Sequence, residues 1–280
     1  MSSPPSVLFH YTTQAGLLGI LATDSIWATK IHYLNDSSEY LLALDLAANF
    51  LKTLLTGEHS KTKKRKIQCL LDNLKTIARM NVCVCSFSAK QDLLSQWRAY
   101  SGQPGGYSVG FNTNLIQKEG QTQGFLLAEC IYDANEQKRL VEELVTNSLA
   151  IDFNIAPSRI DPKRPRTMIA LATGGSFAMD IAKLAPIIKS NAFFEEQEWR
   201  LISTAGISVD NMSFRPGQSM LTPYVPVQLD ITKSNCLTSV TVGPTPHTEL
   251  AKLATQNLLA RRSLSQSVEV SSSAAPYRGW

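Results

Sequence analysis

Apolar residues along the chain fall into short runs with strand-like character, separated by longer segments whose apolar positions recur at helical spacing. Nine runs rich in β-branched and aromatic residues are predicted as strands, at 7–10, 25–33, 82–87, 107–111, 125–132, 199–203, 223–231, 237–243 and 267–270. Segments of helical periodicity predict helices at 14–24, from 35–37 to 55, from the basic cluster Lys61–Lys66 to 79, and at 92–100, 135–150, 167–189 and 248–262.

Strands lie early, in the middle and late in this order, with helices inserted between them. The pattern predicts an α+β fold, a single domain over 1–280 with a mostly antiparallel sheet and helical insertions around 36–80 and 134–190. The proline- and arginine-rich segment 157–167 is expected to be an exposed loop or linker, and Lys61–Lys66 to separate two helices.

Composition narrows the class of protein. The chain has 280 residues, 44% hydrophobic and 18% charged, which excludes a collagen-like, disordered or coiled-coil protein. No apolar run approaches the roughly 20 residues of a membrane span, and the first residues lack a basic region followed by an apolar one. We therefore expect a soluble, cytoplasmic protein that does not bind membranes.

The cysteine spacing and the absence of known motifs mainly exclude classes of site. The five cysteines are irregularly spaced, so reduced thiols are expected. The sequence contains no GxGxxG, Walker A, HExxH, GxSxG or EF-hand pattern, and no metal site is predicted.

Polar and aromatic residues gather in four clusters. In the first, His10, Tyr11 and Thr12 leave a strand directly before a helix, a place suited to an anionic or hydroxyl-rich ligand. The structural alternative is that Thr12 or Thr13 caps the helix and His10 satisfies a backbone carbonyl.

In the second cluster, Asn35, Asp36 and Glu39 stand beside Trp27 and Tyr33. Taken alone, this cluster reads as a helix start, because Asn35 or Asp36 can cap and Glu39 suits the first helical turn.

The third cluster surrounds a predicted strand–helix unit and holds Ser86, Ser88, Gln96, Trp97, Arg98 and Tyr100. Arg98 can pair with a phosphate through its planar fork, although a surface arginine beside a core tryptophan is the simpler interpretation.

In the fourth cluster, Glu196, Glu198 and Arg200 would share one face if the strand has already begun at Glu196. Two carboxylates on one face cost free energy unless a ligand or water compensates their charge. The alternatives are an edge strand whose face is solvated, and an ion pair with Arg200.

Together these clusters resemble a family of bacterial proteins catalogued as a domain of unknown function. That family shows the motifs HYT, LW-A, YLND-S-E, CFS-K-DLLSQWRAY, GYS-GF, E-EWRL and PYR. In this chain they correspond to 10–12, Ile26-Trp27-Ala28, 33–39, Cys85 to Tyr100, Tyr107 to Phe111, 196–201 and 276–278. This resemblance spans nearly the whole chain and implies no activity.

The opening FHYTTQAGLLGIL is also similar to the opening of ADP-ribosyltransferases of the DNA-targeting toxin type. That resemblance implies a split central sheet and NAD as substrate, with His10 on the nicotinamide ribose. The Glu196-Gln197-Glu198 segment corresponds to the E-x-E arrangement, which implies that Glu198 is catalytic and that Glu196 orients the acceptor.

The same resemblance implies a cofactor-binding set. Tyr11, Trp27, Tyr33 and Tyr107 are the candidates for stacking on nicotinamide, and the middle-strand tyrosine or serine of the superfamily has no unambiguous match. Arg98 would hold the pyrophosphate. The remaining members of the expected NAD set are Thr12, Asn35, Asp36, Ser88, Gln96 and Trp97.

The leading hypothesis is an NAD-consuming enzyme, a toxin or antiphage effector that acts on a nucleic-acid or protein acceptor and is paired with an antitoxin or immunity partner. The basic stretches Lys61–Lys66 and Arg159–Arg166 would contact phosphates, or are simply solvated. A module that binds a nucleotide or ADP-ribose without turnover is the first alternative. The second is a nucleotide or nucleic-acid hydrolase that uses Glu196 and Glu198.

Overall fold

The computed structural model describes residues 4–34, 37–101, 105–150, 175–217, 219–231 and 235–275. Its strands are β1 (Val7–Thr12), β2 (Ser25–Lys30), β3 (Cys83–Ser88), β4 (Tyr107–Asn112), β5 (Phe125–Glu129), β6 (Glu198–Ser203), β7 (Ser213–Pro216), β8 (Leu221–Gln228), β9 (Leu237–Val242) and β10 (Glu269–Ser272). Its α-helices are α1 (Gln14–Thr23), α2 (Ser37–Thr56), α3 (Lys61–Ile77), α4 (Leu94–Tyr100), α5 (Thr113–Thr122), α6 (Ala134–Ala150), α8 (Gly175–Leu184) and α9 (Thr248–Arg261).

All ten strands of the described residues join one open sheet. Its main path runs β10-β9-β4-β1-β3-β2-β8-β7, and β6 pairs with β3 on one side and β5 on the other. The pairings are antiparallel except for the one between β9 and β10. The predicted α+β class with a mostly antiparallel sheet is therefore confirmed.

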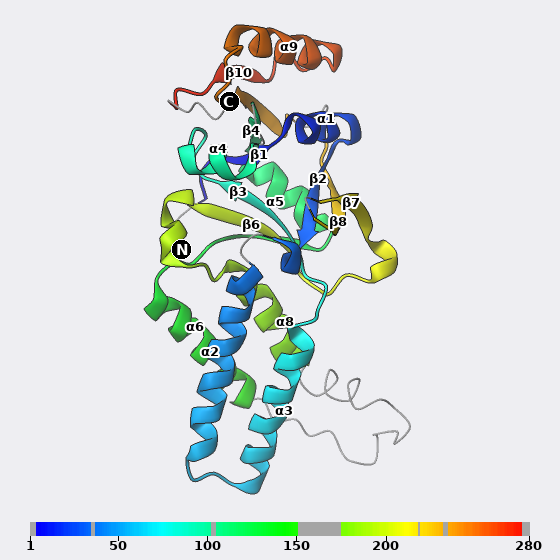
Figure 1. Ribbon diagram of the computed structural model, residues 1–280. Helices are drawn as coiled ribbons and strands as arrows, with labels where there is room; N and C mark the ends of the chain where they lie inside the picture. Colours follow the sequence, from blue (N-terminus) through cyan, green and yellow to red (C-terminus); the bar gives the residue numbers. More distant parts are fainter. Residues whose placement is uncertain are drawn as a thin grey trace.

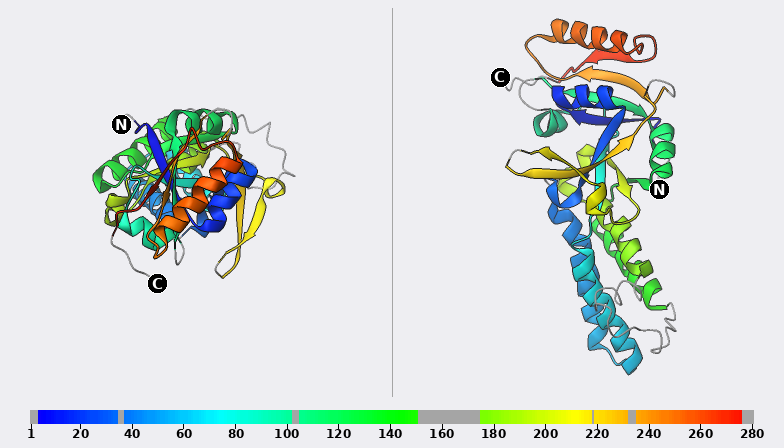
Figure 2. Two further views of the ribbon diagram at one scale, coloured as in Figure 1. Left: turned by 90° about the horizontal axis from the view of Figure 1, so that it is seen from above. Right: turned by 90° about the vertical axis from the view of Figure 1, so that its right-hand side faces the viewer.

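The long helices form an elongated bundle below the sheet (Figure 1). Helices α2, α3, α6 and α8 run side by side in it, whereas α9 covers the opposite end of the molecule (Figures 1 and 2). Helix α2 follows β2 in sequence, and α6 follows β5, so the two helical insertions leave the sheet from the strands on either side of the β3–β6 pair. The helices of the predicted insertions around 36–80 and 134–190 thus pack against one another in one bundle.

Strands β3 and β6 are buried on both faces, which sets the position of the candidate site. Cys85 and Leu201 point into the core shared by the sheet with α1 and α5. Val84 and Ile202, one residue earlier and later, point into the core formed with the helical bundle. Successive side chains of a strand point to opposite faces, so these two central strands separate the two cores.

Several boundaries differ from the prediction. The basic stretch Lys61–Lys66 does not separate two helices but forms the first turns of α3, which Ser60 caps through a hydrogen bond from the Lys63 amide over 3.2 Å. Five positions of α3 at helical spacing are buried, at residues 67, 70, 73, 74 and 77, whereas its first five residues, 61–65, are exposed to solvent.

Other boundaries changed as well. The helix expected to run to Lys189 ends at Leu184 and continues as a 3₁₀ turn over Ala185–Ile187, where Pro186 cannot donate the next helical hydrogen bond. Strand β5 stops at Glu129, and β7 was not predicted. The segments 157–167 and 167–174 lie outside the described residues.

The state of the cysteines and the character of the helices bear on two further expectations. All five cysteines are free, as expected. Among the described helices, none combines the length and the apolar character needed to cross a bilayer.

Candidate functional site

The sheet forks at β3. On one edge, β3 pairs with β6 continuously from Val84 to Ser88. On the other edge, β2 pairs with Cys83 and Val84, and β1 is registered with β3 through Phe9 and Ser88. Between these two contacts, β1 and β2 diverge to different neighbours, β4 and β8, so the sheet opens beside the middle of β3.

His10 fills this opening. Its Nδ1 lies 2.9 Å from the carbonyl oxygen of Ser86, in the middle of β3. The ring packs 5.8 Å from the ring of Phe87, and Nδ1 is 3.8 Å from Sγ of Cys85. Because a carbonyl only accepts hydrogen bonds, Nδ1 carries the proton and Nε2 keeps its lone pair.

The charge state of His10 follows from its surroundings. Burial lowers the pKa of His10, the hydrogen bond to Ser86 opposes that shift, and the positive charge of Arg215 lowers the pKa further. The imidazole is therefore neutral near pH 7. The alternative that His10 satisfies a backbone carbonyl is correct as far as its Nδ1 is concerned.

The ends of β1, β3 and β6 are tied together next to this opening. Ser88 Oγ donates to the carbonyl of Glu196 over 2.7 Å, and the Ala89 amide donates to the carbonyl of Gln197 over 3.0 Å. The Tyr11 hydroxyl donates to the carbonyl of Lys90 over 2.8 Å. Three of the four sequence clusters thus meet at one point of the sheet.

A buried cluster of four charges lies on β6 and the turn before it. Lys189 Nζ is 2.7 Å from Glu196 Oε2 and 2.6 Å from Glu198 Oε2. Arg200 donates from Nε to Glu198 Oε1 over 2.8 Å and from Nη2 to Oε2 over 3.0 Å. Its Nη1 donates to the carbonyl of Pro186 over 2.6 Å. All four side chains are buried, and the two cations and two carboxylates sum to zero charge.

The electrostatics of this cluster keep Glu198 ionised. Burial alone would raise the pKa of Glu198, but the charges of Arg200 and Lys189 and the hydrogen bonds that these two residues donate lower it to about 2. Burial would lower the pKa of Lys189, but Glu198 and Glu196 raise it above its usual range. Both groups stay charged over the physiological pH range.

Glu196 does not reach the cluster by strand alternation. It ends a 3₁₀ segment, Asn191–Glu196, and Gln197 adopts a left-handed conformation with φ 43° before β6 begins at Glu198. A non-glycine residue in this conformation is uncommon and is often stabilised by its surroundings at functional sites. The expectation of two glutamates on one strand face is therefore wrong for Glu196, although Glu198 and Arg200 do share a face.

Nor is β6 an edge strand with a solvated face, since it lies between β3 and β5 and all six of its residues are buried. The compensating cation, Lys189, was missed by sequence reasoning. The sequence signal for Lys189 was weak, because it is a single lysine at the end of a predicted helix.

The structure separates His10 from Glu198 by strand β3. Ser86 and Ser88 are registered opposite Arg200 and Glu198, so these four side chains point to one face. The His10 ring contacts Cys85 and Phe87, which point to the other face. The two groups are neighbours across the sheet without being in contact.

Two of the aromatic candidates have structural roles. Tyr11 is buried, and its hydroxyl accepts a hydrogen bond from the Leu93 amide over 2.9 Å in addition to the one it donates. Trp97 is 1% exposed, and its Nε1 donates to Asp92 over 2.6 Å. The two rings pack edge to face at 4.8 Å, which anchors α4 to β1.

The other aromatic candidates are accessible to different degrees. Trp27 is 36% exposed and packs 4.5 Å from the ring of Tyr224. Tyr33 is 40% exposed, with Lys30 Nζ 5.9 Å from its ring centroid. Tyr107 is half-buried on β4. Trp27 is thus the candidate that combines an exposed ring with a position beside the sheet opening.

The polar candidates are distributed unevenly. Thr12 is half-buried, and it is Thr13 that caps α1, accepting from the Gly16 amide over 3.1 Å. Gln96 is buried in α4, whereas Arg98 points to the exposed side of that helix. Asn35 and Asp36 lie outside the described residues.

A second arginine near the opening was not singled out from the sequence. Arg215 on β7 donates to Thr29 Oγ1 over 3.3 Å, and its guanidinium carbon lies 5.6 Å from the centroid of the Trp27 ring. Arg215 was not recognised from the sequence because the short strand that carries it, β7, was not predicted.

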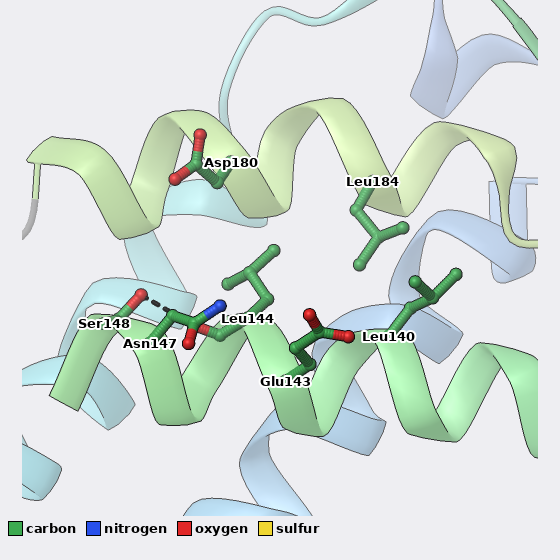
Figure 3. A pocket seen from close by; sticks show the side chains of 7 residues that line it. All are labelled: Leu140, Glu143, Leu144, Asn147, Ser148, Asp180 and Leu184. Atoms are coloured by element: carbon green, nitrogen blue, oxygen red, sulfur yellow. Dashed lines mark hydrogen bonds between the residues drawn. The ribbon is translucent and has the colours of Figure 1, made fainter. Parts of the chain in front are cut away.

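A pocket of about 330 Å³ lies elsewhere, between α6 and α8 in the helical bundle (Figure 3). Leucines 140, 144 and 184 and the carboxylates Glu143 and Asp180 are among its lining residues, and none of the predicted site residues reaches it. Across the described ranges, no group of three His, Cys, Asp or Glu side chains is arranged to hold a metal ion.

Sequence comparison matches a segment of the chain that contributes part of this site. A family described as a protein of unknown function, DUF2971, matches residues 96–201. The DUF2971 match runs from α4 to β6 and includes Trp97, Tyr107, Glu196 and Glu198; His10 and Trp27 precede it. The expected resemblance to a family of unknown function is confirmed over this segment. No curated protein and no solved structure matches the chain.

Proposed function

We propose that this protein is an NAD-dependent ADP-ribosyltransferase-like enzyme. The observation that carries the proposal is that hydrogen bonds tie the strand ends bearing Tyr11, Ser88 and Glu196–Glu198 together beside the sheet opening that His10 fills. The His10 ring and the Glu198 carboxylate approach this place from opposite faces of β3. These segments come from widely separated parts of the sequence, and each supplies a polar group that a fold would otherwise keep at its surface.

In this proposal, the bond between C1′ of the nicotinamide ribose and the ring nitrogen breaks, and its electron pair leaves with neutral nicotinamide. Positive charge develops at C1′, and a fixed carboxylate stabilises it electrostatically. Glu198 is ionised for this task, and Glu196 is the second carboxylate, which would orient the acceptor. Neutral His10 offers Nε2 as a hydrogen-bond acceptor for a ribose hydroxyl.

Lys189 and Arg200 are positioning residues in this scheme. They hold Glu198 in one orientation through three hydrogen bonds of 2.6–3.0 Å. A carboxylate fixed in this way needs little reorganisation as charge develops, which is the physical source of electrostatic catalysis.

The acceptor we propose is a nucleic-acid base or a protein side chain, for a toxin or antiphage effector acting in the cytoplasm and held in check by an antitoxin or immunity partner. Residues 61–65 of the Lys61–Lys66 stretch form an exposed basic start of α3 that suits phosphate contacts, whereas Lys66 is half-buried and donates to the carbonyl of Leu149. The second basic stretch, Arg159–Arg166, lies outside the described residues.

The test is a titration of the full chain with NAD followed by measurement of nicotinamide release. Wild type should release nicotinamide, and Glu198→Gln should reduce the rate about 100-fold or more. Glu143→Gln on α6 is the matched control, because it removes an exposed carboxylate that is paired with Arg139 and lies outside the cluster. Nicotinamide release by Glu198→Gln at the wild-type rate would refute the catalytic role, and so would an equal loss of rate in Glu143→Gln.

The second candidate is a module that binds a nucleotide or ADP-ribose without turnover. It is favoured by one observation: both carboxylate oxygens of Glu198 are already engaged by Lys189 and Arg200. NAD binding by wild type and by Glu198→Gln with equal affinity, without nicotinamide release from either, would select this function.

A further inference from the structure

Arg215 is a half-buried charged side chain with few partners. Its Nε is buried and has no hydrogen-bond partner, and Nη2 makes only a 3.3 Å hydrogen bond to Thr29 Oγ1. Among the described residues, no carboxylate forms an ion pair with it. By contrast, the buried Arg200 is paired with Glu198. Burial of an N–H group without a partner costs free energy, which a bound acceptor would recover.

An aromatic surface lies directly under this guanidinium. The carbon of the Arg215 guanidinium is 5.6 Å from the centroid of the Trp27 ring, and the ring of Tyr224 is 4.5 Å from Trp27 at an interplanar angle of 31°. Trp27 remains 36% exposed. An exposed indole next to a cation is a surface on which a nucleotide base can stack.

The strand register explains why these groups meet. Tyr224 of β8 is registered opposite Thr29 of β2 on one side and Ser213 of β7 on the other. Trp27 lies two residues before Thr29 on β2, and Arg215 lies two residues after Ser213 on β7, so both side chains point to the face of Tyr224. This arrangement is a product of pairing between three strands and is absent from any local sequence pattern.

The group lies beside the sheet opening that His10 fills. The charge of Arg215 contributes to the lowered pKa of His10. Trp27 also borders helix α1, since a Cβ added at Gly19 would come within 3.9 Å of the indole. The Trp27 ring therefore lies between Tyr224, α1 and Arg215, and the guanidinium over it is the group that would meet an anion.

We propose that Arg215 binds a phosphate group of a nucleotide whose base or ring system stacks on Trp27. This inference rests on the proposed function for the identity of the ligand, and it assigns the phosphate contact to Arg215 in place of Arg98. The planar guanidinium suits bidentate contact with phosphate oxygens, and its Nε would gain the acceptor that it lacks.

The test uses isothermal titration of the full chain with ADP, ADP-ribose and adenosine. Arg215→Gln should weaken ADP and ADP-ribose binding about 10-fold or more, the effect of losing a hydrogen-bonded charge pair, while adenosine binding stays unchanged. Arg139→Gln on α6 is the matched control, because it removes one charge from an exposed arginine paired with Glu136 and Glu143. Trp27→Ala should weaken all three ligands.

Arg215→Lys is the second variant, which keeps the charge and serves if Arg215→Gln unfolds. It should bind ADP more weakly than wild type, because an ammonium cannot make the bidentate contact. Wild-type affinity for ADP in both Arg215 variants would overturn the proposal, as would a wild-type protein that binds neither ADP nor ADP-ribose.

The outcomes separate this inference from the proposed function. ADP binding that depends on Arg215, in a protein that releases no nicotinamide, would refute the proposed enzymatic activity and support the phosphate site. If Arg215→Gln changes neither nicotinamide release nor ADP binding, the enzymatic activity is supported and the phosphate site is refuted. Titration with an oligonucleotide, in the absence of free nucleotide, distinguishes a phosphate of a nucleic-acid backbone from a phosphate of a free nucleotide. Tighter binding of the oligonucleotide than of ADP would count against the proposal.

Discussion

Lys189 and Glu198 are joined by a 2.6 Å hydrogen bond within a buried cluster that also holds Glu196 and Arg200. The cluster balances two positive and two negative charges in a part of the protein that excludes water. A balanced set of this kind tolerates burial, whereas removal of one member leaves an uncompensated charge.

Glu198→Gln should therefore destabilise the protein strongly, apart from any effect on activity. Loss of one partner from a buried ion pair costs about 3–5 kcal/mol in the free energy of unfolding. Urea denaturation measures this quantity. The exposed Glu143→Gln, which also removes a carboxylate from an arginine pair, should leave it nearly unchanged. Similar midpoints for the two variants would show that the cluster contributes little.

The same cluster predicts how stability depends on pH. The pKa of Glu198 is about 2 in the folded protein and 4.5 in the reference state, so the unfolded chain binds the proton more readily. The stabilisation is complete above pH about 5 and is lost as the pH falls toward 2. Urea midpoints of wild type should fall more steeply over this window than those of Glu198→Gln. Parallel curves would contradict the assignment.

His10 gives a separate prediction near neutral pH. Its pKa in the folded protein lies below the reference value of 6.5, so the unfolded chain binds the proton first as the pH falls. The resulting stabilisation is present above pH 6.5 and is lost below it. Nitrogen NMR should show a neutral ring protonated at Nδ1 at pH 7, with His10→Asn used to assign the signal. A ring that is charged at pH 7, or protonated at Nε2, would contradict the hydrogen bond to Ser86.

Tyr11 should contribute to stability through its hydroxyl, which joins the Lys90 carbonyl to the Leu93 amide. Tyr11→Phe leaves both backbone groups without this partner, at a cost of about 1–3 kcal/mol. Tyr107→Phe on β4 removes a hydroxyl that makes no hydrogen bond to another described residue and is the control. Thermal and urea unfolding of the two variants would measure the difference, and equal stability would refute the anchoring role.

Much of the secondary structure could be predicted from the sequence because it depends on short-range patterns. The apolar run at 82–87 became β3, and the Thr13 cap begins α1 where the polar residues predicted it. Prediction failed where a local signal was short or ambiguous. Strand β7 has four residues and alternates exposed with half-buried positions, and the lysine-rich start of α3 has the composition of a loop.

The candidate site shows the same division. The sequence alone singled out His10, Glu196, Glu198 and Trp27 as residue types too costly or too distinctive to be ordinary. It did not determine their partners. His10 meets Ser86 across 76 residues of sequence, and Arg215 meets Thr29 across 186.

Such contacts are decided by strand pairing and register, because a shift of one residue would turn each side chain to the opposite face of the sheet. Residue type and local periodicity therefore reveal the strands, the helices and the unusual polar groups. Three further features arise only on folding: β3 separates His10 from Glu198, Lys189 balances the two glutamates, and Arg215 lies over Trp27. They depend on segments that are distant in the sequence, whereas periodicity is a local property of the chain.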